Sequence, residues 1–158
     1  IALIHNTKAV LGVIYAPVQG VTYYAYEGFG AYKVDALKKP EQICVEKKRR
    51  IPLIITCGNN TPGSHFEEFV KKVGELEFHV MGSSLKSCLV ADGSADIYAR
   101  LGPTSEWDTA AAQCIVEEAG GFLTDLSRKP LKYNTKDSLL NPHFLVFGDN
   151  NENWESFL

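Results

Sequence analysis

The fold is decided by residues 106–121, which read Glu-Trp-Asp-Thr-Ala-Ala-Ala-Gln-Cys-Ile-Val-Glu-Glu-Ala-Gly-Gly. After Trp107-Asp108, small and apolar residues recur at helical spacing: Ala111, Ala112, Ile115, Val116 and Ala119. Gly120 and Gly121 follow, where a helix commonly ends because glycine adopts positive φ without strain. The pattern predicts a helix that opens at Trp107-Asp108 and buries one stripe of its surface.

Short β-rich segments lie on both sides of this helix, and a second helix is predicted over 85–91, after Gly82-Ser83-Ser84. The expected strands are 51–56, 78–81, 97–101, 122–124 and 144–147. Residues 64–67 form a capping-box pattern for another short helix. We therefore expect residues 51–158 to form one layered α/β domain with roughly five strands.

The first 37 residues have a different character, because β-rich runs alternate with polar turns. This alternation predicts an antiparallel β meander over 1–37. Residues 38–50 are rich in charge and contain Pro40, which indicates an exposed connection. For the basic run Lys47-Lys48-Arg49-Arg50 within it, a solvated linker is favoured over a binding patch.

The composition is that of an ordinary globular chain: 158 residues, 45% hydrophobic and 22% charged. A formal net charge of −3 gives no overall attraction to a nucleic-acid polymer or an acidic membrane, so an anionic ligand must be bound by local basic residues. Four widely spaced cysteines form no CxxC pair, which predicts reduced thiols. With no transmembrane segment or signal peptide in the pattern, we expect a cytoplasmic protein. The first residue, Ile1, stands inside an apolar run, from which we expect that a natural N-terminal region is missing.

One segment has the composition of an anion site. Gly82 lets a phosphate approach the backbone, Ser83 can donate from its hydroxyl, and Lys86, one turn later, adds a full positive charge. The alternative is plain helix capping by serine, with Lys86 on a solvated face.

Two further residues are candidates because of their position. Arg100 ends an expected strand, and ligands of open α/β sheets favour the carboxyl ends of strands; the alternative is a surface arginine that packs on Tyr98 or Trp107. Asp108 offers the hard carboxylate oxygens that Mg²⁺ prefers, but spacing alone favours an ordinary N-cap aspartate. Glu117 and Glu118 are interpreted as surface residues, and the four histidines form no zinc pattern.

Taken together, three segments resemble the inositol monophosphatase superfamily: 82–91, 98–102 and 106–121. The resemblance covers nearly the whole chain and is strongest to the 3'(2'),5'-bisphosphate nucleotidases of the CysQ type. It implies a layered αβαβα sandwich, of which residues 1–37 would be the end of the N-terminal sheet and 51–158 the C-terminal domain.

The resemblance also implies roles for residues. Asp108 would be a catalytic metal ligand, chiefly for Mg²⁺, with more than one ion in the complete enzyme. Ser83, Lys86 and Arg100 match positions that contact the nucleotide, and the backbone of Gly82 would lie behind the phosphate. Where Arg100 stands, inositol phosphatases carry an acidic residue that meets inositol hydroxyls; a cation suits a second phosphate.

Two departures limit this inference. The family's Asp-Pro-x-Asp-Gly-Thr motif and its upstream glutamate are absent from these 158 residues, so the remaining metal site is one ligand and we expect the isolated chain to be inactive. Some eukaryotic relatives also have a substrate-contacting histidine where this chain has Asn59.

The sequence thus predicts part of a metal-dependent phosphatase that converts 3'-phosphoadenosine 5'-phosphate to AMP and phosphate. An inositol or sugar monophosphatase of the same fold is the alternative enzyme. A non-catalytic nucleotide-binding or assembly module is the alternative of another class. The sequence leaves the oligomeric state open.

Overall fold

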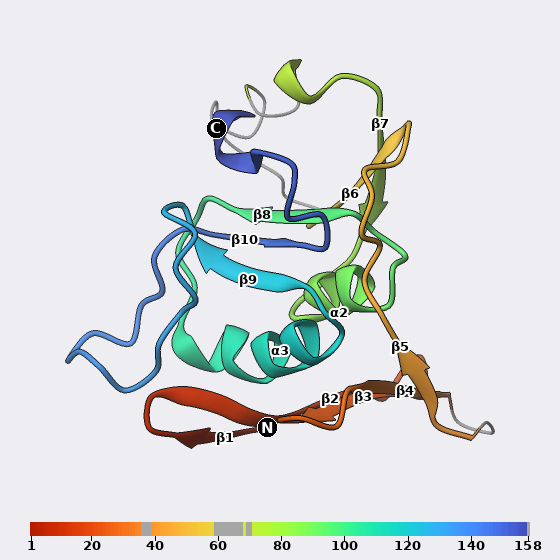
Figure 1. Cartoon of the computed structure of the whole chain (residues 1–158). Helices are drawn as coiled ribbons and strands as arrows, with labels where there is room; N and C mark the ends of the chain where they lie inside the picture. Colours follow the sequence, from red (N-terminus) through yellow and green to blue (C-terminus); the bar gives the residue numbers. More distant parts are fainter. Residues whose placement is uncertain (36–38, 59–67, 69–70, 158) are drawn as a thin grey trace.

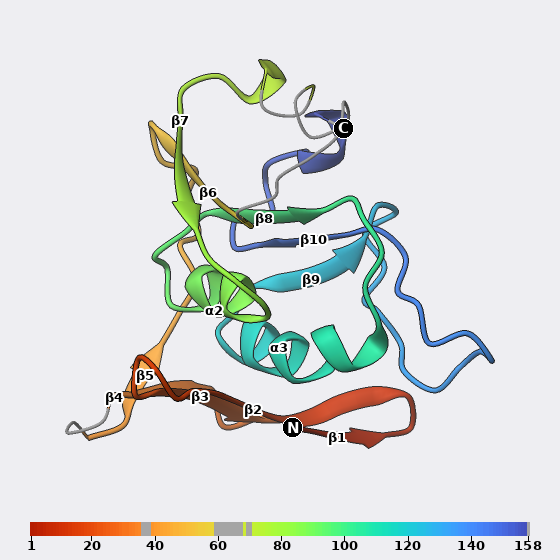
Figure 2. The ribbon, with the colours of Figure 1, turned by 180° about the vertical axis from the view of Figure 1, so that it is seen from behind.

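A computed structural model describes residues 1–35, 39–58, 68 and 71–157. Two β-sheets lie on either side of a layer of two helices, and Figures 1 and 2 show these layers from opposite sides. The helices are α2 (Leu85–Ala91) and α3 (Glu106–Glu118). The prediction of an α/β layered protein is confirmed.

The first sheet is an antiparallel meander in the order β1-β2-β3-β4-β5. Its strands are β1 (Ala2–His5), β2 (Lys8–Ala16), β3 (Val21–Tyr26), β4 (Ala31–Asp35) and β5 (Glu41–Ile43). One face packs on α3, where Gly12 allows a close approach: a Cβ at this position would lie 2.2 Å from the carbonyl oxygen of Ala111. In the described part of the chain no helix covers the other face, which exposes Leu3 and Tyr15.

The second sheet has the order β7-β6-β8-β10-β9. Its strands are β6 (Leu53–Cys57), β7 (Leu76–Val80), β8 (Ile97–Arg100), β9 (Phe122–Asp125) and β10 (Phe144–Phe147). β6 runs parallel to β7 and β8, whereas β10 is antiparallel to β8 and β9. Because β6, β7 and β8 are parallel, their carboxyl ends lie at one edge of the sheet, where Arg100 ends β8.

Helix α3 is the centre of the core. It buries Ala112, Ile115 and Val116 between the two sheets, as the stripe in 106–121 predicts. The helix ends before Gly120, whose φ of 84° lies in the left-handed region. Beyond β10, the chain closes with the short 3-10 helix η1 (Trp154–Phe157), whose Trp154 is fully buried against Phe147.

The exposed connection predicted for 38–50 is wrong in part. β5 lies within it as the fifth strand of the first sheet. The basic run is solvated only in its first half: Lys47 and Lys48 are exposed, whereas Arg49 pairs with Glu152 at 3.2 Å and Arg50 with the buried Asp96 at 2.9 Å. A long side chain such as arginine can pack its aliphatic part against the protein while its charged end forms an ion pair.

Two further predictions are not tested by the described structure. The helix expected after the capping box at 64–67 lies mostly outside the described residues. The division into an N-terminal remnant and a C-terminal domain stays a prediction. Within the described residues, no helix is both long and apolar enough to cross a membrane.

Candidate active site

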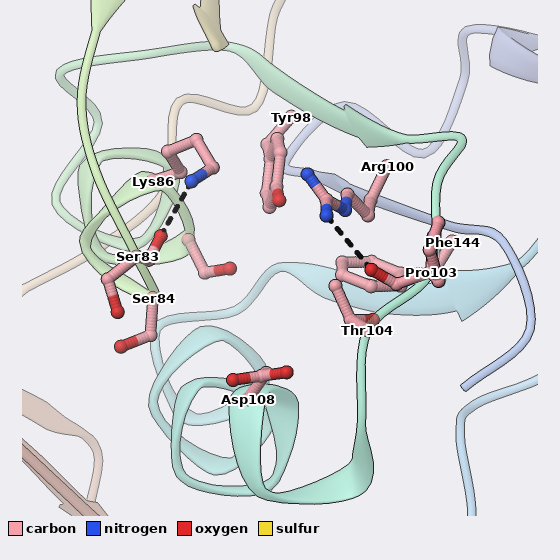
Figure 3. A pocket seen from close by; sticks show the side chains of 10 residues that line it. Ser83, Ser84, Lys86, Tyr98, Arg100, Pro103, Thr104, Asp108 and Phe144 are labelled. Carbon is pink, nitrogen blue, oxygen red and sulfur yellow. Dashed lines mark hydrogen bonds between the residues drawn. The ribbon is translucent and has the colours of Figure 1, made fainter. Parts of the chain in front are cut away.

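Four of the predicted site residues come together at one pocket of about 270 Å³ (Figure 3). Ser83 and Lys86 come from the start of α2, Arg100 from the end of β8, and Asp108 from the first turn of α3. The remaining lining residues are Ser84, Ser87, Tyr98, Pro103, Thr104 and Phe144. Residues distant in sequence are thus neighbours, although the role of each remains a prediction.

Lys86 reaches the pocket because its side chain turns back over the start of its own helix. Nζ donates to the carbonyl oxygen of Ser83 at 2.8 Å and lies 5.1 Å from the ring centre of Tyr98. The residue is 6% exposed, so the alternative of a solvated lysine is wrong. An ammonium group has three protons, so Lys86 can donate to a ligand while it holds Ser83.

Ser83 has a φ of 53°, a left-handed conformation that costs energy for a residue with a side chain. The expected alternative of serine capping is not observed: Ser84 is the N-cap of α2, and its side chain makes no capping hydrogen bond. Both serines line the pocket. Gly82 is not among the lining residues, and an added Cβ there would meet nothing within 4 Å.

Arg100 is half-buried and lies across the pocket from α2. Its Nη2 donates to the carbonyl oxygen of Pro103 at 2.9 Å, which folds the guanidinium over the loop that follows β8. Its Nε is buried and has no hydrogen-bond partner in the described structure. An unpaired buried donor is costly.

Asp108 is the third residue of α3 rather than its N-cap. Ser105 is the N-cap, and the two residues form a capping box in which Asp108 Oδ2 accepts from Ser105 N at 2.9 Å. The predicted helix start is therefore late by three positions, because the capping role belongs to Ser105. Among the described residues Oδ1 accepts no hydrogen bond, and the carboxylate faces the pocket.

The pocket is positive on one side and negative on the other. Burial lowers the pKa of Lys86, and the nearby Arg100 guanidinium lowers it further. Burial raises the pKa of Tyr98 to about 12, so its hydroxyl stays neutral and able to donate at physiological pH. Two close cations with unused donors suit a ligand of high negative charge, such as a phosphate.

The donors around Asp108 fit a divalent cation only in part. A carboxylate oxygen and the nearby Thr104 hydroxyl are hard oxygen donors of the kind that Mg²⁺ binds. No group of three or more histidine, cysteine or acidic side chains that could hold a metal ion occurs among the described residues. Among the described residues, the pocket therefore offers this one carboxylate, and a metal role for Asp108 stays a prediction.

The interpretation of Glu117 and Glu118 as surface residues is wrong. Both are half-buried, and Glu118 accepts from the backbone of Gly28 and Gly30 at 3.0 and 2.9 Å. The carboxylate thereby fixes the turn between β3 and β4, about 90 residues away in the sequence. Helical periodicity does not reveal such a contact. Asn59 lies outside the described residues.

Comparisons with known proteins find relatives over nearly the whole chain. The family model described as the inositol monophosphatase family matches residues 1–154. The 3'(2'),5'-bisphosphate nucleotidase CysQ of Haemophilus influenzae is 42% identical over 99% of this chain and 58% of its own length. CysQ of Escherichia coli strain K12 is 40% identical over 92% of the chain and 58% of its own length.

The fold has matches among solved structures. A crystal structure of CysQ from Bacteroides thetaiotaomicron, a bacterial member of the inositol monophosphatase family, aligns with a TM-score of 0.83 at 36% identity, covering 94% of this chain and 61% of that one. The Thermotoga maritima inositol monophosphatase aligns with a TM-score of 0.77 at 26% identity over 99% and 58%. The chain spans about 58% of the curated relatives it matches. With a family model that matches nearly every residue, the chain belongs to the inositol monophosphatase family.

Proposed function

We propose that this chain is the nucleotide-binding part of a Mg²⁺-dependent phosphatase that removes the 3'-phosphate of 3'-phosphoadenosine 5'-phosphate, giving AMP and phosphate. The observation that supports it best is the pocket in which Lys86 and Arg100 face Asp108. Relatives named as bisphosphate nucleotidases at 40–42% identity support the choice of substrate.

Each residue has a part in this proposal. Lys86 and Arg100 donate charge-assisted hydrogen bonds to phosphate oxygens, and Ser83 donates from its hydroxyl. Arg100 accommodates the second phosphate, which an inositol monophosphate lacks. Asp108 faces the 3'-phosphate and would hold one Mg²⁺. When bound, that ion lowers the pKa of a water and stabilises charge on the phosphoryl oxygens.

The reaction needs no covalent intermediate. Water forms a new bond to the 3'-phosphorus while the bond to the ribose 3'-oxygen breaks, and Lys86 and Arg100 balance charge on the phosphate oxygens. One carboxylate holds Mg²⁺ weakly, and the 158 residues contain no Asp-Pro-x-Asp-Gly-Thr motif. We therefore propose that this chain alone binds the nucleotide without turnover. The number of ions and the cytoplasmic location remain predictions.

Isothermal titration calorimetry tests the proposal. The chain is titrated with 3'-phosphoadenosine 5'-phosphate and with inositol 1-phosphate, with and without Mg²⁺. We expect the nucleotide to bind more tightly by about 10-fold or more, since the extra phosphate gains hydrogen bonds to a charged group. The variant Arg100→Glu should lose this preference. Equal binding of both ligands by the wild-type chain would favour the inositol monophosphatase, and no binding of either would contradict the proposal.

A further inference from the structure

The loop between β9 and β10 is bound to the segment that contains Asp108. The Asn141 side-chain amide donates from Nδ2 to the Ser105 carbonyl oxygen at 2.8 Å. It also contacts the hydroxyls of Thr104 at 3.2 Å and Thr109 at 3.1 Å. One side chain thus reaches acceptors before, at and after the start of α3, and Asp108 lies between them.

Backbone hydrogen bonds strengthen the same contact. Asn141 N donates to the Thr104 carbonyl oxygen at 2.8 Å, and Glu106 N donates to the Leu139 carbonyl oxygen at 2.8 Å. Leu140 and Ser105 form an isolated antiparallel β-bridge. The loop therefore adds a short strand-like pairing beside the first turn of α3. Lys136 of the same loop also pairs with Glu106 at 2.9 Å, whereas Asn141 bonds on both sides of Asp108.

Asn141 acts on Asp108 through Ser105. The Asp108 carboxylate is oriented by the hydrogen bond from Ser105 N to Oδ2 at 2.9 Å. The direction of that N–H depends on where the Ser105 backbone lies, and Asn141 holds the carbonyl oxygen of the same residue. Thr104, which Asn141 also contacts, lines the pocket opposite Ser84. Asn141 itself is not among the lining residues.

We propose that Asn141 is a positioning residue, which fixes the 104–109 segment so that the Asp108 carboxylate faces the phosphate pocket. The proposal rests on the proposed function, because it concerns the metal ligand of that site. Asn141 does not touch the ligand. Its loss should leave the cations of the pocket in place and misplace the carboxylate.

The test uses the whole chain with 3'-phosphoadenosine 5'-phosphate and Tb³⁺, a trivalent cation that binds carboxylate and phosphate oxygens and emits when a nearby indole transfers energy to it. Trp107, which precedes Asp108 and is 70% exposed, serves as the antenna. The variants are Asn141→Ala and Asp108→Asn. Ser138→Ala is the matched control: it lies in the same loop, and its hydroxyl accepts from Leu140 N at 3.3 Å. Trp107→Phe gives the background signal.

In the wild-type chain we expect Tb³⁺ emission that depends on 3'-phosphoadenosine 5'-phosphate, which Asp108→Asn abolishes and Ser138→Ala retains. For Asn141→Ala the apparent Tb³⁺ affinity should fall about fivefold, the effect of losing one or two hydrogen bonds of ordinary net strength. The nucleotide affinity without Tb³⁺ should stay within about twofold, because the Asn141 side chain makes its hydrogen bonds to Thr104, Ser105 and Thr109 and not to Lys86 or Arg100.

The possible failures are distinguishable. Unchanged Tb³⁺ affinity in Asn141→Ala would overturn the positioning role alone. Equal losses of Tb³⁺ affinity and metal-free nucleotide affinity would show a general structural role and would also overturn it. A wild-type chain that gives no Tb³⁺ emission dependent on 3'-phosphoadenosine 5'-phosphate would contradict the metal role of Asp108 and, with it, both proposals.

Discussion

Replacing Lys86 by methionine should separate ligand binding from stability. The substitution keeps an unbranched side chain of similar length and removes the charge from the pocket. In the native chain the ammonium is almost fully buried, with a hydrogen bond to Ser83 and the ring of Tyr98 beside it. Burial and Arg100 lower its pKa, so the folded state disfavours the charge that the ligand requires.

Two effects of opposite sign follow. Phosphate loses a hydrogen bond to a charged group, worth about 1.5–3 kcal/mol, so the affinity for AMP should fall by about 10- to 100-fold. The ligand-free chain loses the contacts to Ser83 and Tyr98 but is relieved of the desolvated charge, so its free energy of unfolding should stay within about 1 kcal/mol of wild type or rise.

The pH dependence of the free energy of unfolding provides an independent test of the buried charge. A lysine whose pKa is lowered on folding binds fewer protons in the folded state than in the unfolded state. The free energy of unfolding should therefore rise as pH increases from the lowered pKa toward the unfolded value of 10.5. Lys86→Met should lack this rise.

The assays are urea unfolding at several pH values and calorimetric titration with AMP. Lys8→Met is the matched control, because Lys8 is exposed and pairs with Glu27 away from the pocket. Unchanged AMP affinity in Lys86→Met would refute the role of Lys86. A loss of stability by several kcal/mol would refute the account of its burial.

Three further predictions concern the scaffold and the pocket wall. Gly12→Ala should destabilise the chain by about 1–3 kcal/mol in urea unfolding, because the new Cβ would collide with Ala111; Gly82→Ala, which meets nothing within 4 Å, is the control. Ser83→Gly should relieve the strain of the left-handed backbone and stabilise the chain by about 0.5–1 kcal/mol. It should also weaken AMP binding a few-fold through loss of the hydroxyl. A variant less stable than wild type would show that the Ser83 backbone is not strained. Burial would raise the pKa of Glu106, but its hydrogen bonds outweigh burial and lower the pKa. The free energy of unfolding should therefore fall as pH drops below about 4.5, and Glu106→Gln should flatten that loss. An unchanged pH profile of stability in the variant would refute this.

Local periodicity predicted most of the fold. The stripe of α3, the small helix over 85–91 and the strands of both sheets follow from patterns that span a few residues. β5 was missed because three residues in a charged segment give no alternation; their pairing with β4 is what makes them a strand. Arg49 and Arg50 were assigned to solvent for the same reason, since their acidic partners lie about 50 to 100 residues away.

The site was predicted by resemblance more than by spacing. Spacing alone made Asp108 an N-cap and placed Lys86 in solvent, whereas tertiary structure gives the cap to Ser105 and buries Lys86 beside Tyr98. Tyr98 and Thr104 were not predicted as pocket residues, because no local pattern distinguishes them from ordinary strand and loop residues. No local pattern distinguishes Asn141 either, because its contacts with the start of α3 exist only in three dimensions.

We propose that one pocket holds a nucleotide phosphate between Lys86 and Arg100, with Asp108 facing it. A crystal structure of the chain with 3'-phosphoadenosine 5'-phosphate tests this arrangement directly. We expect density for a phosphate within hydrogen-bond distance of Lys86 Nζ and the Arg100 guanidinium, with the 3'-phosphate on the side of Asp108. Ordered nucleotide at another surface, with this pocket filled only by solvent, would contradict the account.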